Sequence, residues 1–284
     1  MPVVKVVMNG AISIVNAVAT GKGATLGTSL KTTILVHSSR GEGVSMNDQN
    51  INNPQFLKLI TKQIVPFNIL QNTHLHISVD SNMPIGCGLK SSSVLSTGIL
   101  MACNKLFKLE LSESQLLNTS AVASLKAGVS LTGAYDDACG CYYGGFIVTD
   151  NVKNKIIKSE KCIQQLSVVI FIPKYQKRCH INSLKKLDFV FHRAWLLAKN
   201  SNYWNAMTLN GMATALIFDS SPDLIISLLE KGAIAASTSG NGTAIAAITK
   251  QPNLNTIKNV FTSYAEGETL LTSINNNKPQ IHEL

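Results

Sequence analysis

The sequence predicts a fold that mixes helices and strands and divides into two domains. Its 284 residues are enough for one large domain or two of ordinary size. Apolar residues alternate over residues 73–81, as in a half-buried strand, and then recur at helical spacing over residues 94–106. The character of the chain changes between Asp150 and Lys161. We therefore expect an N-terminal domain over residues 1–155 and a C-terminal domain over residues 156–284.

The composition is that of a folded globular chain. Hydrophobic residues make up 45% of the sequence and charged residues only 14%, which argues against disorder. No uninterrupted apolar run reaches the roughly 20 residues that a membrane-spanning helix needs. Residues 1–10 lack the charged, apolar and cleavage regions of a signal peptide. We expect a cytoplasmic protein with no membrane partner.

The net charge of +9 admits several explanations. A nucleic-acid-binding surface would concentrate basic residues, but here they are scattered, and Lys185–Lys186 is the densest run. A positive field also suits small anionic substrates such as ATP and carboxylates, and a solvated basic surface needs no partner. We expect no nucleic-acid partner.

Six cysteines show neither a CxxC spacing nor a histidine pattern typical of metal sites. In a cytoplasmic chain of this size we expect free, buried thiols and no zinc. The residues are Cys87, Cys103, Cys139, Cys141, Cys162 and Cys179.

The N-terminal residues are predicted to form two strands, residues 3–8 and 31–37, joined through a lysine loop. In that loop Lys22 lies between Gly21 and Gly23, where a lysine is exposed and can reach a phosphate as a point charge. An ordinary surface turn has the same pattern.

Two further segments precede the alternating strand. The polar, glycine-bearing residues 40–53 are predicted to form a long loop that could act as a lid. Residues 54–71 are predicted to form a helix that breaks or bends at Pro66.

The central feature of the sequence is the Gly/Ser segment between the strand at 73–81 and the helix at 94–106. Gly86 and Gly88 can take backbone conformations closed to other residues and bring N–H groups close to a ligand. The following helix start adds unpaired donors and partial positive charge, three serines add hydroxyls, and Lys90 adds a cation. Both the Walker pattern and the dinucleotide fingerprint are absent. We predict a phosphate-binding loop made by Pro84, Ile85, Gly86, Cys87, Gly88, Leu89, Lys90, Ser91, Ser92 and Ser93.

Two adjacent acids follow the next predicted helix. That helix spans residues 111–127, and Ser112 with Gln115 forms a capping-box pattern at its start. Asp136 and Asp137 then lie among small residues and glycines. An acid in such surroundings is either a helix cap or a site residue with a perturbed environment.

The rest of the chain is predicted to mix strands and helices around a second Gly/Ser loop, residues 237–244. A hairpin joins residues 146–150 to residues 155–158. Strands are predicted at 166–172, 233–236 and 269–274, and helices at 181–201, 203–218, 222–231 and 254–264.

Three motifs occur in the order typical of the GHMP kinases, which include galactokinase, homoserine kinase and mevalonate kinase. They are the lysine loop, the Gly/Ser segment, which resembles the family's P-x-G-x-G-L-x-S-S, and Ser-Gly-Asn-Gly at 239–242. Within that family, NAVATGKG at 16–23, GLKSSS at 88–93 and TGAYDDA at 132–138 are similar to archaeal shikimate kinases. The likeness covers nearly the whole chain.

The resemblance implies an α+β, two-domain GHMP kinase fold with the active site in the cleft between the domains. It implies ATP-dependent phosphorylation of shikimate to shikimate 3-phosphate, a step towards chorismate and the aromatic amino acids, with Mg²⁺ as cofactor. ATP and shikimate would be the bound partners, and the protein would be a monomer or a homodimer.

Other functions remain as alternatives. Another GHMP small-molecule kinase, for homoserine or mevalonate, is the nearest one. Two marks argue against it. Lys90 lies where those enzymes usually carry the second glycine of GLGSS, and Asp136 and Asp137 form the acid pair that resembles the archaeal shikimate kinases. A nucleic-acid-binding module and a catalytically inactive binding protein on the same fold belong to other classes.

The resemblance also assigns roles to residues. The amides of residues 86–91 would hold the phosphates, and Ser92 corresponds to the hydroxyl that meets Mg²⁺. The catalytic acid of mevalonate kinase lies seven residues before a Gly-Gly pair, and counting back from Gly144 gives Asp137. Asp136 is the alternative base, and Lys22 is the third candidate catalytic residue.

Four residues are candidates for holding shikimate: Asn16, Arg178, Gly240 and Gly242. A carboxylate favours a bidentate arginine, and Arg178 follows a predicted strand, although a plain surface charge would look the same.

One expected residue is missing. Related kinases carry a glutamate that binds Mg²⁺ about one helix-length before the catalytic aspartate. Eleven residues before Asp137 this chain has Lys126, and Glu110 and Glu113 are poor substitutes by position. The sequence therefore leaves the acidic magnesium ligand open.

Overall fold

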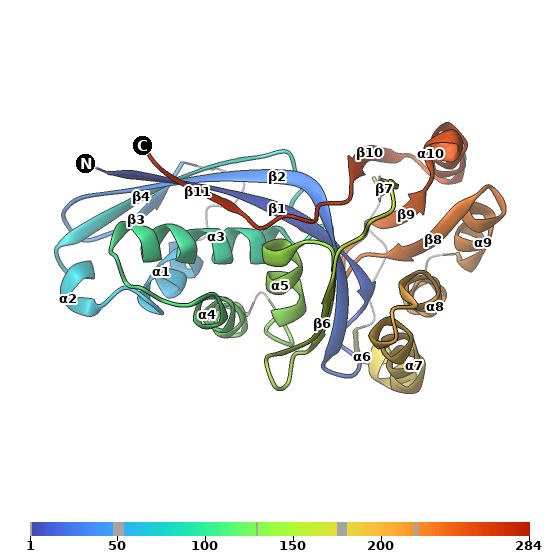
Figure 1. The fold of residues 1–284 in the computed structure, drawn as a ribbon, viewed down its shortest axis with the longest axis horizontal. Helices are drawn as coiled ribbons and strands as arrows, with labels where there is room; N and C mark the ends of the chain where they lie inside the picture. Colours follow the sequence, from blue (N-terminus) through green and yellow to red (C-terminus); the bar gives the residue numbers. More distant parts are fainter. Residues whose placement is uncertain (1, 48–53, 129, 175–180, 219–220) are drawn as a thin grey trace.

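The strands of the chain form two sheets, and helices cover one side of each (Figure 1). The structure is a computed structural model that describes residues 2–47, 54–128, 130–174, 181–218 and 221–284. Within these residues the architecture is α+β, as the resemblance implied.

The larger sheet has seven strands and contains both ends of the chain. Its main order is β11-β1-β2-β4-β3, while β5 pairs with the start of β2 and β6 pairs with β5. All these pairs are antiparallel except β3 with β4. The strands are β1 (Val3–Val15), β2 (Lys22–Arg40), β3 (Gly43–Met46), β4 (Thr73–Ser81), β5 (Phe146–Asp150), β6 (Lys155–Glu160) and β11 (Gln280–Glu283).

The smaller sheet is antiparallel, in the order β10-β7-β9-β8. One of its two inner strands, β7, packs against two cores, since Val168 and Ile170 belong to the main core while Val169 and Phe171 belong to a second one. A strand buried on both faces has no polar alternation, which is why residues 166–172 are almost uniformly apolar. The strands are β7 (Ser167–Pro173), β8 (Ala233–Thr238), β9 (Ile245–Thr249) and β10 (Gly267–Ser273).

The helices of the first half of the chain lie on one face of the larger sheet (Figure 1). Two of them, α3 and α5, pack directly against β1 and β2, and α4 packs against both. Residues 93–103 of α3 are all buried, so this helix forms the centre of the main core. The helices are α1 (Pro54–Lys62), α2 (Phe67–Leu70), α3 (Ser91–Leu106), α4 (Glu113–Lys126) and α5 (Tyr135–Tyr143).

The helices of the second half cover the smaller sheet. Both α8 and α9 contact β8, and α10 contacts β7. Apolar residues of α9 and α10 form the second core with the sheet. These helices are α6 (Ile181–Leu184), α7 (Asp188–Lys199), α8 (Tyr203–Ile217), α9 (Pro222–Glu230) and α10 (Leu254–Tyr264), with single 3₁₀ turns at Lys185–Leu187 and Gln251–Asn253.

Several sequence predictions are wrong in detail. Lys22 is not in a loop, because it is the first residue of β2, and Gly23 lies inside that strand. The predicted loop at 40–53 contains β3, and residues 48–53 lie outside the described part. The predicted helix at 181–201 is split by a 3₁₀ turn.

Other local predictions are confirmed. The helix at 54–71 breaks at Pro66, which is the N-cap of α2. The capping box of Ser112 and Gln115 is formed at the start of α4. The hairpin of β5 and β6 is present.

The described residues contain no helix that is both long and apolar enough to cross a membrane. They also contain no cluster of three or more histidine, cysteine or acidic residues placed to bind a metal. Cys103, Cys139, Cys141 and Cys162 are buried free thiols, and Cys87 is a half-buried one. Cys179 is outside the described residues.

Candidate active site

A cavity of about 410 Å³ lies where the first half of the chain meets the loop between β8 and β9. Its lining comes from the end of β1, the start of α3, the α4–α5 connection, α5 and that loop. The lining residues include Ser13, Asn16, Gly86, Gly88, Lys90, Ser91, Ser92, Ser93, Ser130, Thr132, Asp136, Asp137, Gly240, Asn241 and Gly242.

The start of α3 points into this cavity. Ser91, Ser92 and Ser93 form its first turn and line the cavity, and Lys90 is the N-cap residue. No side chain caps the helix. The first N–H groups of a helix have no intrahelical acceptors and carry partial positive charge, so this end of α3 suits an anion such as phosphate.

Six of the ten residues of the predicted phosphate loop line the cavity, and the other four do not. Pro84 and Ile85 precede the cavity-lining part, and Leu89 is a core residue with 1% exposure. The carbonyl of Cys87 accepts a hydrogen bond from the Ala244 N–H at 3.0 Å. Cys87 and Leu89 therefore anchor the loop.

The phosphate loop packs backbone to backbone against the second Gly/Ser loop. The Ser239 hydroxyl donates to the Gly88 carbonyl at 2.7 Å. A Cβ at Gly88 would lie 1.9 Å from the backbone carbonyl oxygen of Ser239, and a Cβ at Gly242 would lie 2.1 Å from the Cys87 carbonyl carbon. Glycine is thus required at both positions, because any side chain would force the loops apart.

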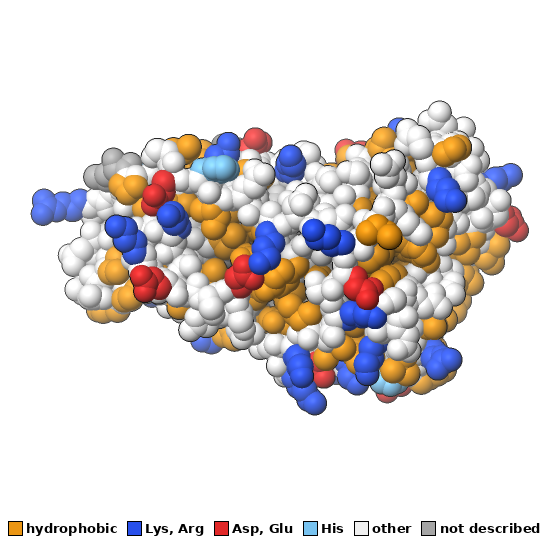
Figure 2. Space-filling model, in the orientation of Figure 1, with side chains coloured by type: hydrophobic (Ala, Val, Ile, Leu, Met, Phe, Trp, Pro, Cys, Tyr) orange, Lys and Arg blue, Asp and Glu red, His pale blue; other side chains and the backbone are white. Residues whose placement is uncertain are grey.

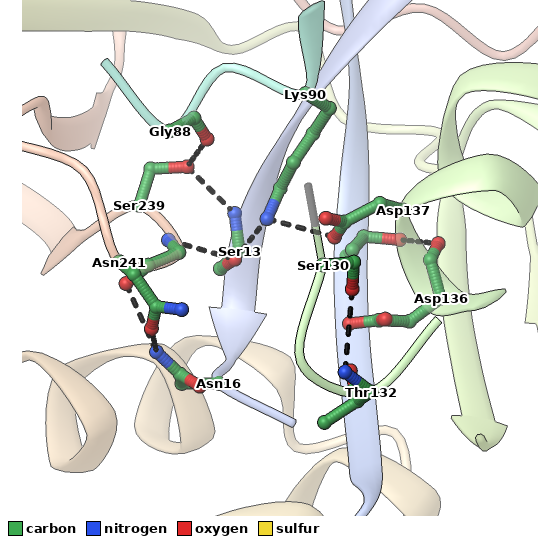
Figure 3. Close-up of polar contacts among 12 residues, drawn as sticks. Ser13, Asn16, Gly88, Lys90, Ser130, Thr132, Asp136, Asp137, Ser239 and Asn241 are labelled. Carbon is green, nitrogen blue, oxygen red and sulfur yellow. Dashed lines mark hydrogen bonds and ion pairs between the residues drawn. The ribbon is translucent and has the colours of Figure 1, made fainter. Parts of the chain in front are cut away.

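Lys90 and Asp137 form an ion pair inside the cavity (Figure 3). The Lys90 Nζ lies 2.7 Å from Asp137 Oδ1 and also donates to the Ser13 hydroxyl at 2.7 Å. The Lys90 side chain is 5% exposed and that of Asp137 is 20% exposed. Burial alone would lower the pKa of Lys90, but the facing carboxylates of Asp137 and Asp136 outweigh it and raise that pKa.

Asp136 is buried more deeply than its neighbour. Its Oδ1 accepts from the Asn151 side-chain amide at 2.7 Å, and its own N–H donates to Asn151 Oδ1 at 3.1 Å. Burial, and then the charge of Asp137, raises the pKa of Asp136 to about 7. A Cβ at Gly23 would lie 2.2 Å from Asp136 Oδ2. Gly23 therefore makes room in β2 for this carboxyl group.

The remaining polar groups of the cavity come from a network around Asn16. Its side-chain amide donates to the Gly240 carbonyl and to Asn241 Oδ1, both at 2.9 Å (Figure 3). Its backbone N–H donates to Asn210 Oδ1 at 2.8 Å, and Asn210 is fully buried in α8. Asn16 and Gly240, two of the predicted substrate-binding residues, are therefore in direct contact at the cavity. Gly242, a third, also lines the cavity but packs against Cys87 and Gly88 of the phosphate loop.

Lys22 is not brought to the cavity. Its ammonium lies 4.8 Å from the ring centroid of Trp195, a cation–π contact, and Lys22 is not among the lining residues. Arg178 lies outside the described residues. Of the lining residues that the structure describes, Lys90 is the one lysine or arginine.

The possible substitutes for the missing glutamate also lie elsewhere. Glu113 pairs with Lys278 at 2.6 Å and accepts from the Tyr143 hydroxyl at 3.1 Å. Neither Glu113 nor Glu110 lines this cavity, and Lys126 bonds to Gln63 Oε1 at 3.1 Å.

Sequence reasoning missed two serines at the centre of the site. Ser13 accepts from Lys90 and from the Gly240 N–H, and its own N–H donates to the Ser239 hydroxyl at 3.1 Å. Ser13 is 2% exposed and Ser239 is fully buried. For Ser13 the available signal was a serine among apolar residues of a buried strand, where a hydroxyl needs a partner. Ser239 was noted as part of the motif at 239–242, but without a role in the site.

The chain is similar in sequence to known proteins. Residues 56–145 match the GHMP kinases N terminal domain. The chain is 30% identical to a shikimate kinase of Methanobrevibacter smithii, covering 94% of this chain and 95% of the relative. It is 31% identical to a shikimate kinase of Pyrococcus furiosus, covering 93% and 97%.

A solved structure gives the same fold. The homoserine kinase of Cytophaga hutchinsonii superposes with a TM-score of 0.73 at 17% identity, covering 98% of this chain and 97% of that one. An identity of 17% supports the fold alone. The two archaeal relatives, at 30% and 31% identity, align over nearly their whole length and show the family. The chain therefore belongs to the GHMP kinases and, within them, to the family of archaeal shikimate kinases.

Proposed function

We propose that this protein is a shikimate kinase, which transfers the γ-phosphoryl group of ATP to the 3-hydroxyl of shikimate. One observation carries the proposal: the start of α3 and the carboxylate of Asp137 face the same cavity. The first suits a phosphate and the second suits a hydroxyl proton. The names of the archaeal relatives supply the acceptor.

The residues of the cavity have separate roles in phosphoryl transfer. The backbone N–H groups at the start of α3 hold the nucleotide phosphates, and the serine hydroxyls add further donors. Asp137 accepts the proton that the 3-hydroxyl loses as its oxygen bonds to phosphorus. Phosphoryl transfer needs little other covalent help, because positioning and charge neutralisation provide most of the rate.

Magnesium is expected from the kinase chemistry, and the donor set fits it. Mg²⁺ takes oxygen ligands and in nucleotide sites binds largely through the phosphates. The Ser92 hydroxyl is exposed at the cavity and is the residue that we propose as a protein ligand. When bound, the ion neutralises charge on the phosphates.

The side of the cavity around Asn16 is where we propose that shikimate binds. Asn16 and Gly240 are hydrogen-bonded there, and Gly242 also lines the cavity. Arg178 remains our candidate for the carboxylate of shikimate, on the sequence argument alone.

The charge distribution gives no support to the nucleic-acid alternative. On the face seen in Figure 2, lysine and arginine side chains are spread out among acidic ones. A small anionic substrate needs no such surface, because the uncapped start of α3 in the cavity already suits an anion.

The experiment is an ATP-consumption assay with shikimate, homoserine and mevalonate as acceptors. We expect ADP to form with shikimate and Mg²⁺ at a far higher kcat/KM than with the other two. A higher kcat/KM for homoserine would transfer the assignment to another GHMP kinase.

A further inference from the structure

Lys90 has a backbone conformation that is unfavourable for a lysine. Its φ is 72° and its ψ is 25°, the left-handed region that glycine enters freely and that a side chain disfavours. Backbone strain of this kind persists where the surroundings hold the residue in place, and it is concentrated at functional sites. The side chain at this position must therefore have contacts that outweigh the strain.

Those contacts are with the protein itself. The Lys90 ammonium has three donors, and two are used by Asp137 Oδ1 and the Ser13 hydroxyl, each at 2.7 Å. The side chain is 5% exposed. A lysine that served chiefly as a mobile cation for phosphate would be exposed and would keep its donors free.

The second Gly/Ser loop is built around the same ammonium. A Cβ at Gly240 would lie 3.1 Å from Lys90 Nζ, so the glycine leaves space for the ammonium. The Gly240 N–H donates to the Ser13 hydroxyl at 3.0 Å, and that hydroxyl also accepts from Lys90. Lys90 is thus held by β1 and the loop on one side and paired with α5 on the other (Figure 3).

We propose that Lys90 is a positioning residue that acts through Asp137, and that it ties the proton-accepting carboxylate to the first residues of the phosphate-binding helix. Lys90 is the N-cap of α3, so the base and the phosphate site share one rigid attachment. This inference rests on the proposed kinase activity and on Asp137 as its base, and it replaces the expectation that Lys90 binds phosphate directly.

The test is a double-mutant cycle on kcat with Lys90→Met, Asp137→Asn and the double variant. Since Lys90 acts through Asp137, we expect Lys90→Met alone to lower kcat by roughly 10- to 100-fold. The double variant should match Asp137→Asn within about threefold, because residues that act as a unit are not additive. The KM and Kd for ATP should change by less than about threefold.

Two results would overturn the inference. One is that the two effects on kcat multiply in the double variant, which would mean independent roles. The other is that the Kd for ATP rises at least about tenfold in Lys90→Met with kcat little changed, which would make Lys90 a phosphate ligand. Lys105→Met, on the same helix and outside the cavity, is the matched control and should keep the wild-type kcat.

A second measurement keeps the inference testable without turnover. The same four proteins are unfolded in denaturant without ligands, and Lys90→Met should cost less stability in the Asp137→Asn background than in wild type. An equal loss of stability from Lys90→Met in the two backgrounds would contradict the pairing of Lys90 with Asp137. Lys90→Gln replaces Lys90→Met if the latter does not fold.

Failure of the proposed function is recognised separately: the wild type would phosphorylate an acceptor other than shikimate. The kcat cycle is then run with that acceptor.

Discussion

The two adjacent aspartates of the cavity have different surroundings, which separates their roles. Asp137 is partly exposed and pairs with Lys90, whereas Asp136 is buried and bonds to Asn151. A carboxylate that meets a substrate hydroxyl must be reachable from the cavity. The geometry therefore favours Asp137 as the base, in agreement with the spacing argument from Gly144.

The first prediction concerns this base. Asp137→Asn should keep the fold and ATP binding but lower kcat by roughly 10²–10⁴, because an amide cannot take the proton. Steady-state kinetics and ATP calorimetry check both halves. Asp136→Asn is the matched comparison, and a dead Asp136→Asn beside a fully active Asp137→Asn would show that the assignment is reversed.

The second prediction concerns the stability of the protein at different pH. The pKa of Asp136 is raised from an ordinary value of 3.8 to about 7, so its stability contribution is present below pH 4 and is lost as the pH rises through 7. Asparagine does not titrate. The stability of Asp136→Asn relative to wild type should therefore rise between pH 5 and pH 8, by an amount on the order of a few kcal/mol. Thermal unfolding at both pH values measures it, and a constant difference would rule the account out.

The site residues that were predictable from the sequence are those whose type is unusual for its neighbourhood. Two adjacent acids among small residues and a lysine before three serines stand out in the sequence. Ser13 does not stand out, because its partner Lys90 is 77 positions away along the chain. Ser239 was named within a motif, but its bond to Gly88, 151 positions away, could not be predicted. Lys22 has the pattern of a site lysine, but the strand that begins there carries it to Trp195.

At the scale of elements, the site depends on two loops that touch through glycines. The prediction is that Gly88→Ala lowers kcat at least about tenfold and destabilises the fold by roughly 1–3 kcal/mol, because the new Cβ overlaps the Ser239 carbonyl oxygen. Kinetics and denaturant unfolding measure the two effects.

Gly86→Ala is the control for stability. Gly86 also has a positive φ of 75°, but a Cβ there would have nothing within 4 Å. It should cost only the conformational strain of about 1 kcal/mol. Equal losses of stability in the two variants would mean that the contact between the loops contributes nothing.

Elements with a local signal were predictable, and elements held by distant partners were not. The capping box of α4 and the break at Pro66 depend on neighbours in the sequence. The strand β11 is exposed at every residue and exists through its pairing with β1. The start of α5 has no side-chain cap and both acids lie inside its first turn, so neither of them is the helix cap that was the alternative interpretation.

At the scale of the whole molecule, the cavity exists because the second half of the chain places one loop on the first half. Residues 240–242 line it together with the start of α3 and with α5. The last strand, β11, returns to the larger sheet, so the two sheets do not divide the chain at a single point. The division into domains at residue 155 stays a prediction.

The central claim is that this cavity transfers a phosphoryl group from ATP to shikimate. The most direct measurement is ³¹P NMR of the reaction of wild type and Asp137→Asn with ATP, Mg²⁺ and shikimate. We predict that the wild type produces a phosphomonoester signal matching shikimate 3-phosphate and ADP in equal amounts, and that Asp137→Asn does so at least about 100-fold more slowly. ADP and inorganic phosphate with no phosphomonoester, or equal rates for the two proteins, would contradict the account.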